Sequence, residues 1–148
     1  EKIYPKLLSV LQAFLSRREE GLLQRFTSAQ HWNFYDWSPF MDDQPLGRET
    51  EEYPDLMINC LFIIALEHFE YICKKVGKPF EFAQLKNTLS KNTRETFFDK
   101  HTGLFTMLVT EESFTELGNI MAIMAGLTTD EESRFIAQKL VQKELIPC

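Results

Sequence analysis

Apolar residues recur with the spacing of an amphipathic helix at the start of the chain. Pro5 suits the first turn of a helix, because a first-turn residue needs no backbone N–H donor. Apolar positions then follow at helical intervals, and Gly21 closes the segment. They are Leu7, Leu8, Leu11, Phe14 and Leu15. The pattern predicts a helix with one buried face.

A second apolar segment predicts a long buried helix. It begins near Pro54 and Asp55 and runs to Val76, where Gly77 suits the left-handed end of a helix. Its apolar residues cover most of the circumference, so neighbouring elements should bury it on more than one side. Its longest apolar run, residues 56–66, is about half the length that a bilayer span requires. We therefore predict no membrane segment.

A third helix and a short β-ribbon are expected next. Phe82, Leu85 and Leu89 form one stripe of a helix that ends near Phe97. This helix should form an antiparallel hairpin with the preceding one. Two apolar pairs within residues 97–105 flank a polar turn that ends in a glycine, which favours a two-stranded ribbon.

The last third of the chain predicts a second helical hairpin. Ser113 with Glu116, and Thr129 with Glu132, have the spacing of capping boxes, and each precedes an apolar helical stripe. Gly126 ends the first of these helices. Consecutive hairpins predict an all-α fold, either an open solenoid or a closed α/α toroid. No strict repeat of about 33 to 47 residues is visible, which disfavours the common solenoid families.

Composition narrows the function classes. The chain has 148 residues, about the size of one domain, and its net charge of −6 disfavours nucleic acid as a partner. Three cysteines and three histidines show no metal-ligand spacing, and no phosphate-binding loop is present, so we expect no metal and no cofactor. The chain starts without Met and already in a helical pattern, so we expect a piece of a larger protein.

Aromatic residues concentrate in residues 31–40, which we call the aromatic segment. It holds both tryptophans, Trp32 and Trp37, with Tyr35 and two phenylalanines around the carboxylate of Asp36. Flat rings with a neighbouring carboxylate suit a carbohydrate subsite. The segment lies in a connection, residues 22–53, that lacks helical periodicity and is expected to be irregular. Alternatively, the rings anchor the connection in the core and Asp36 caps a turn.

Two carboxylates are candidates for acid and base chemistry. Hydrolysis of a glycosidic bond needs a pair of carboxyl groups roughly 5 to 10 Å apart. Asp36 lies among stacking residues, and Glu116 begins a helix that could point at a central cavity. The capping-box position of Glu116 also explains that residue without catalysis. The residues alone thus give candidates but no convincing catalytic pair.

The order of several short motifs resembles bacterial α-L-rhamnosidase-like six-hairpin glycosidases. Residues 35–39 resemble the Gly-Asp-Trp segment of that family, with Tyr35 in the place of Gly. Residues 63–77 are similar to a family helix that ends before a glycine turn. Residues 97–105 are similar to its ribbon, and residues 115–127 to a later helix in which a Gln or a Glu-His pair precedes Ala-Asn-Ala-Leu-Ala-Leu-x-x-Gly-Leu. The similarity spans nearly the whole chain.

This resemblance implies that residues 1–148 are one domain-sized part of an (α/α)6 toroid, a glycoside hydrolase catalytic domain. It implies that Trp37 contacts the sugar, with Trp32 as a second platform and Asp36 and Tyr35 beside them. The family's acid and base motifs are not found in these residues, so the isolated chain should be inactive. The resemblance also implies a periplasmic or secreted location, although the compartment stays open.

A second reading is a non-catalytic helical-hairpin interaction module, in which the aromatic segment docks a protein or belongs to the core. A severed segment of a toroid would expose apolar helix faces that other hairpins normally cover. Such faces predict self-association of the chain.

Overall fold

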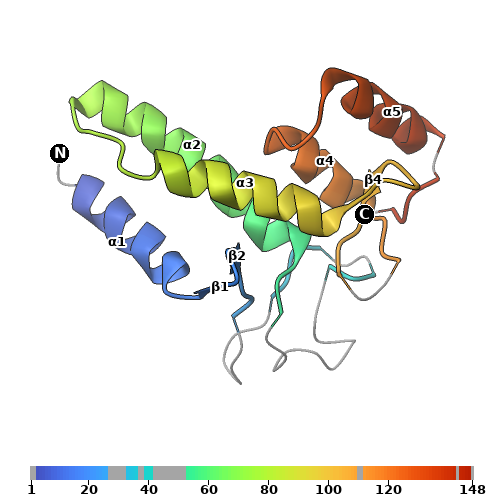
Figure 1. Cartoon of the computed structure of the whole chain (residues 1–148), viewed down its shortest axis with the longest axis horizontal. Helices are drawn as coiled ribbons and strands as arrows, with labels where there is room; N and C mark the ends of the chain where they lie inside the picture. The colour runs from blue at the N-terminus through green and yellow to red at the C-terminus, as the bar shows by residue number, and fades with distance from the viewer. Residues whose placement is uncertain are drawn as a thin grey trace.

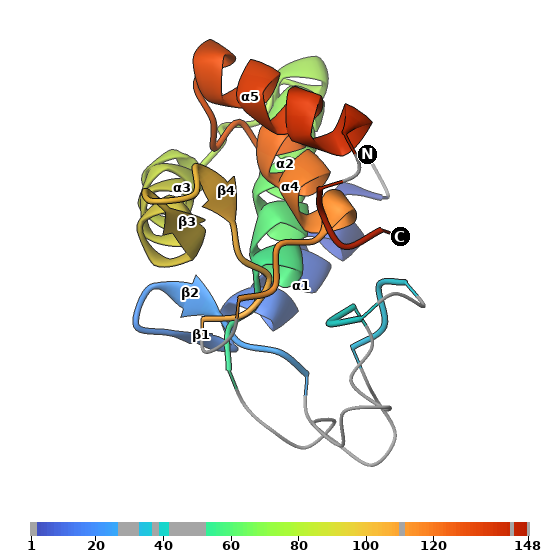
Figure 2. The same ribbon diagram turned by 90° about the vertical axis from the view of Figure 1, so that its right-hand side faces the viewer.

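The computed structural model describes residues 3–26, 33–36, 39–41, 53–109, 112–142 and 144–147. These residues form five helices and two small antiparallel ribbons (Figure 1 and Figure 2). The elements in chain order are α1 (Tyr4–Leu15), β1 (Arg18–Glu19), β2 (Leu22–Leu23), α2 (Leu56–Val76), α3 (Ala83–Phe97), β3 (Phe98–Asp99), β4 (Leu104–Phe105), α4 (Glu116–Met124) and α5 (Asp130–Val141). The expected mainly helical fold with a short ribbon is confirmed, and a closed toroid stays a prediction.

Helix α2 is the central element and has the bounds that the sequence predicts. The Asp55 carboxylate caps its start by accepting a hydrogen bond from the N–H of Ile58 (2.8 Å), and Gly77 ends it with φ of 68°. Helices α3 and α4 pack on α2 (Figure 1). In α1, the ring of Tyr4 stacks on Phe69 of α2. Within the described chain, α2 has the length and apolarity to cross a membrane. Its neighbours bury 56% of that stretch, which fits a core helix.

Two units of the same design follow each other along the chain. Each consists of a helix, an antiparallel ribbon and a second helix: α1, β1, β2 and α2 form the first unit, and α3, β3, β4 and α4 form the second. A glycine with positive φ directly precedes the second strand of each ribbon, Gly21 at 85° and Gly103 at 73°. The expectation of irregular chain from residue 22 onward is therefore wrong for β2, because a two-residue strand leaves no periodic pattern.

A buried asparagine fastens each ribbon to the second helix of its unit. The side-chain oxygen of Asn59 accepts from the N–H of Leu23 (2.9 Å), and its amide nitrogen donates to the Leu23 carbonyl (3.1 Å) and to the carbonyl of the N-cap residue (2.8 Å). Asn119 makes the same three hydrogen bonds, with Phe105 and with the N-cap residue of α4. Both side chains are fully buried, and these bonds satisfy both the amide and the strand.

The helix caps confirm one sequence prediction and correct another. Thr129 and Glu132 form the predicted capping box at the start of α5. At α4 the N-cap is Thr115, whose hydroxyl accepts from the N–H three residues on (3.1 Å). The predicted capping box of Ser113 and Glu116 is therefore wrong, because the N-cap lies two residues after Ser113. The Ser113 hydroxyl instead accepts a hydrogen bond inside the preceding loop.

Two cysteines lie on α2, and both are buried and free. Cys60 and Cys73 point about 220° apart around the helix, so they cannot reach each other. Burial raises the pKa of the Cys60 thiol well above its usual value, with a smaller contribution from the charge of Asp55. Cys60 is thus a core residue without thiolate reactivity.

Candidate functional site

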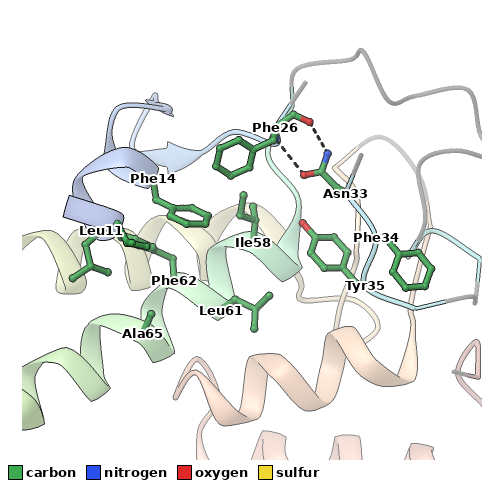
Figure 3. Close-up of a pocket in the computed structure, with 11 residues that line it drawn as sticks. Leu11, Phe14, Phe26, Asn33, Phe34, Tyr35, Ile58, Leu61, Phe62 and Ala65 are labelled. Carbon is green, nitrogen blue, oxygen red and sulfur yellow. Dashed lines mark hydrogen bonds between the residues drawn. The ribbon is translucent and has the colours of Figure 1, made fainter. Parts of the chain in front are cut away.

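An apolar groove of about 410 Å³ opens between α1, α2 and the described part of the aromatic segment (Figure 3). Side chains of α1 form one wall, α2 forms the floor, and residues 33–35 form the far wall. We call this hollow the apolar groove. It is lined by Val10, Leu11, Phe14, Phe26, Asn33, Phe34, Tyr35, Ile58, Leu61, Phe62 and Ala65. Two of these eleven residues carry polar side-chain groups, so the groove suits an apolar ligand better than a free sugar.

Both polar groups of the groove already have partners. The Asn33 side chain accepts from the N–H of Phe26 (3.2 Å) and donates to the carbonyl of the same residue (2.9 Å), as the dashed lines in Figure 3 mark. The Tyr35 hydroxyl donates to the Asp55 carboxylate at 3.0 Å. These bonds fix Asn33 on the chain at Phe26 and Tyr35 on the start of α2. They leave the apolar ring faces toward the groove.

Asp55 and Arg25 form a buried charge cluster that contacts Tyr35. The Asp55 carboxylate caps α2, accepts from Tyr35 and lies 3.9 Å from Nε of Arg25. Arg25 is 1% exposed, and its guanidinium lies 4.0 Å from the centre of the Tyr53 ring. The role of Asp55 at a helix N-terminus is confirmed, whereas sequence reasoning missed Arg25 altogether. Nothing in the sequence around Arg25 indicates that its partner is Asp55, thirty positions later.

The described residues 33–36 and 39–41 are joined by backbone hydrogen bonds. The N–H of Tyr35 donates to the carbonyl of Met41 (2.8 Å), and Phe40 adopts φ of 68°, which is costly for a residue with a side chain. Met41 is fully buried and comes close to Gly118 of α4. Tyr35 thereby lies at the N-terminal end of α2, and Met41 at the N-terminal end of α4.

Asp36 is the described residue of these ranges with an unsatisfied group. Its Oδ2 is buried and has no hydrogen-bond partner among the described residues, although the residue as a whole is partly exposed. A buried carboxylate oxygen without a donor costs free energy, so such atoms often mark the place of a ligand or an ordered water. The expectation that Asp36 has a functional role rests on this atom.

The role of Glu116 as a partner of Asp36 in acid and base chemistry stays a prediction. Glu116 is the first residue of α4 and partly buried, and its N–H donates to the carbonyl of Ile146 (2.9 Å). A carboxylate in the first turn of a helix is also stabilised there by the helix dipole. Glu116 thus has a structural explanation.

The two tryptophans, metal binding and Asp99 are the remaining candidates from the sequence. Trp32 and Trp37 lie outside the described residues, so the expected stacking of their rings on a sugar stays a prediction. In the described part of the chain, no three His, Cys, Asp or Glu side chains gather in a way that could hold a metal ion. Asp99 is a turn residue: the N–H of His101 and the hydroxyl of Thr102 donate to its carboxylate, and these bonds lower its pKa.

Comparison with solved structures finds the same fold in two rhamnosidases. The GH78 family rhamnosidase of Bacillus sp. GL1 matches 94% of this chain with a TM-score of 0.74 and 18% sequence identity. The rhamnosidase from Klebsiella oxytoca with rhamnose bound matches 99% of this chain with a TM-score of 0.74 and 14% identity. The matched regions are 14% and 26% of those chains, so this chain spans a small part of either enzyme.

Sequence comparison gives no corresponding match. No family of known proteins matches the chain, and neither does any curated protein. At identities of 14% and 18% the structural similarity shows a shared fold. The arrangement of hairpins is therefore that of a segment of these rhamnosidases.

Proposed function

We propose that this chain is a segment of a glycoside hydrolase domain related to α-L-rhamnosidases, and that its aromatic segment contacts the carbohydrate substrate. The shared fold with two rhamnosidases over 94% and 99% of the chain is the observation that carries the proposal. The motif order along the sequence independently suggests the same group of enzymes.

The proposed roles follow from the chemistry of each side chain. Trp37 stacks its indole on the apolar face of a sugar ring, and Trp32 offers a second platform. The carboxylate of Asp36, a partly exposed residue whose Oδ2 has no hydrogen-bond partner among the described residues, accepts a hydrogen bond from a sugar hydroxyl. Tyr35 contributes its ring, since its hydroxyl is engaged by Asp55.

The chain supplies substrate contacts rather than a complete catalytic pair. Hydrolysis of a glycosidic bond needs two carboxyl groups at a set separation across the sugar. Asp36 and Glu116 stay candidates, and the position of Glu116 in the first turn of α4 also explains that residue without catalysis. The isolated chain should therefore bind sugar without hydrolysing it, and the acid and base would come from other hairpins of the domain.

Titration with L-rhamnose tests this function. The two tryptophans report directly, so we expect a saturable change of their fluorescence with a Kd on the order of 1 mM. Trp37→Ala should abolish binding, and Asp36→Asn should weaken it about tenfold, because a neutral acceptor makes a weaker hydrogen bond than a carboxylate. Saturation-transfer NMR on the sugar provides a readout that does not depend on tryptophan.

Tyr71→Ala is the matched control, since Tyr71 is an aromatic residue that is 59% exposed on α2 and does not line the groove. It should leave the sugar titration unchanged. Absence of saturable binding at concentrations on the order of a hundred times the expected Kd would contradict the proposal. Equal losses in Trp37→Ala and Tyr71→Ala would contradict the role of the aromatic segment.

The alternative function is a non-catalytic helical interaction module. One observation favours it: the apolar groove presents mainly aliphatic and aromatic side chains, and its two polar groups are already hydrogen-bonded. Such a lining suits a protein surface.

A further inference from the structure

The described part of the aromatic segment is held by separate contacts rather than by a helix or a ribbon. Residues 33–36 belong to none of these elements. A stretch of this kind has no ladder of backbone hydrogen bonds of its own, so individual contacts fix its position. The contacts beside Asp36 therefore decide where its carboxylate lies.

The Tyr35 hydroxyl makes such a contact directly before Asp36. It donates to the Asp55 carboxylate, at 3.0 Å from Oδ2 and 3.2 Å from Oδ1, and Figure 3 shows it directed toward the start of α2. A hydrogen bond to a carboxylate is about twice as strong as one between neutral groups. The Asp55 side chain is 2% exposed, so water competes little for it. Tyr35 is thus tied through the tip of its ring.

Asp55 is a fixed partner for this hydroxyl. Its carboxylate accepts from the N–H of Ile58 (2.8 Å) as the N-cap of α2, and it lies 3.9 Å from Nε of the buried Arg25. Helix α2 is the central element of the fold and is itself packed by α3 and α4. The bond from Tyr35 therefore ends on one of the best-fixed side chains of the chain.

A second tie acts on the backbone of the same two residues. The carbonyl of Met41 accepts from the N–H of Tyr35 (2.8 Å) and from the N–H of Asp36 (3.4 Å). Met41 is fully buried, and its methyl carbon lies 3.8 Å from the place of a Cβ atom at Gly118. Phe40, in between, has φ of 68°, and such a backbone persists where the contacts around it are fixed.

The Asp36 side chain depends on its backbone for its place. Its Oδ2 has no hydrogen-bond partner within the described part of the chain, and the residue is partly exposed. A group that binds a ligand has to be held within about 0.5 Å of its productive position. Whatever holds the backbone of Tyr35 and Asp36 therefore controls the contact that the Asp36 carboxylate can make.

We propose that Asp55 is a positioning residue of the carbohydrate site. It binds the Tyr35 hydroxyl and so holds the next residue, Asp36, where its carboxylate meets a sugar hydroxyl. Asp55 is itself 1% exposed, so it acts through Tyr35 and does not touch the sugar. The inference rests on the proposed function and adds to it a residue nineteen positions after Asp36 in the sequence.

Tyr35→Phe separates the two roles that Tyr35 can have. Phenylalanine keeps the ring that can stack on a sugar and loses the hydroxyl that binds Asp55. The cap of α2 stays in place, so the variant should fold. Without sugar, the N–H groups of residues 35 and 36 should exchange with solvent at least about tenfold faster, because their bonds to Met41 open more often. Amide hydrogen exchange followed by NMR measures these rates.

The same variant should bind L-rhamnose about five- to tenfold more weakly than the wild-type chain in the fluorescence titration. Tyr71→Phe removes a hydroxyl from a ring that is 59% exposed on α2, and it should change neither the Kd nor the exchange rates. Glu132→Gln removes an ion pair between α5 and α3 and should leave the Kd unchanged. These controls separate positioning from the loss of any hydroxyl and from a general loss of stability.

Asp55→Ser tests whether the effect passes through Asp55. Serine is about as good an N-cap as aspartate, but it has no carboxylate for the Tyr35 hydroxyl. In this background, Tyr35→Phe should weaken L-rhamnose binding by less than about twofold further. Asp55→Ser also removes the charge beside Arg25. If it does not fold for that reason, Tyr35→Phe, which keeps the charge, decides the proposal.

Three results would overturn the inference while the wild-type chain binds L-rhamnose. If Tyr35→Phe changes neither the exchange rates nor the Kd, Tyr35 acts through its ring alone. If the Kd rises without faster exchange in the sugar-free chain, the hydroxyl contacts the sugar directly. If exchange is faster and the Kd is unchanged, the bond to Asp55 holds the chain but does not position Asp36 for a sugar.

Failure of the proposed function gives a different result. In that case the wild-type chain shows no saturable binding of L-rhamnose, whatever the exchange rates of Tyr35→Phe are, and the positioning role falls with it. Saturable binding by the wild-type chain and an unchanged Kd in Tyr35→Phe leave the proposed function intact and remove the role of Asp55.

Discussion

Asn59→Ala is expected to lower the free energy of unfolding by about 3–5 kcal/mol, because it removes three buried hydrogen bonds at once. The N–H and the carbonyl of Leu23 would both lose their partner, and Leu23 is fully buried, so water could not replace the amide. Each buried polar group left without a partner costs about 1–3 kcal/mol. The substitution also frees β2 from the first turn of α2.

Urea unfolding followed by far-UV circular dichroism measures this loss. Asn119→Ala should cost a similar amount, since it breaks the equivalent bonds in the second unit. Asn92→Ala is the matched control: Asn92 is half-buried and donates one long bond of 3.4 Å to Gly21, so its loss should cost less than about 1 kcal/mol. If Asn59→Ala lowers the free energy of unfolding no more than Asn92→Ala does, the hydrogen bonds of Asn59 do not hold the first ribbon on α2.

The sequence predicts the parts of this fold that depend on neighbouring residues. The bounds of α2 follow from apolar periodicity together with Asp55 and Gly77, and the structure has the same bounds. The capping box of Thr129 and Glu132 is equally local and is confirmed. Helix periodicity and caps act within about one turn, so one sequence is enough to read them.

Contacts between distant segments could not be predicted in this way. In the sequence Asn59 merely interrupts an apolar run, whereas in the structure it binds Leu23, thirty-six residues earlier. The ribbon of β1 and β2 was missed for the same reason, because two-residue strands are stabilised by that distant amide. The equivalence of α2 and α4 rests on their N-cap bonds and on the side-chain bonds of Asn59 and Asn119. It can be recognised only once these hydrogen bonds are known.

The candidate site shows the same division. The aromatic composition singles out residues 31–40, and Asp36, whose Oδ2 has no partner within the described part of the chain, is one of them. Composition could not show that the Tyr35 hydroxyl is engaged by Asp55, twenty residues away. It also could not show that α1, α2 and the aromatic segment together enclose an apolar groove. Side-chain types indicate a kind of chemistry, and only the packing shows which groups are available for it.

Acid is expected to lower the stability of the fold by protonating Glu132. Arg94 donates to both carboxylate oxygens of Glu132, at 3.0 and 2.6 Å, and so joins α3 to the start of α5. This hydrogen bonding from Arg94 lowers the pKa of Glu132 from 4.5 to about 2, and the N–H of Thr129 adds to the effect. The pair stabilises the fold fully above the unfolded-state pKa, and its contribution is lost as the pH falls through the folded-state pKa.

Between about pH 4.5 and pH 2 the free energy of unfolding of the wild-type chain should therefore fall by about 1–2 kcal/mol because Glu132 becomes protonated. The value is modest because the Arg94 and Glu132 side chains are 34% and 23% exposed, so water screens the pair. Glu132→Gln should remove most of this pH dependence and lower stability at neutral pH by the same amount. Urea unfolding at several pH values between 2 and 7 measures both effects.

Glutamine is the informative replacement, because it can still serve in the capping box with Thr129 while it carries no charge. A loss in Glu132→Gln therefore reports the ion pair with Arg94 rather than the cap. Glu131→Gln changes the exposed neighbour in the same helical turn and should leave the pH profile as in wild type. If Glu131→Gln and Glu132→Gln flatten the profile equally, the effect belongs to the net charge of the α5 N-terminus, and α5 is not held to α3 by this pair.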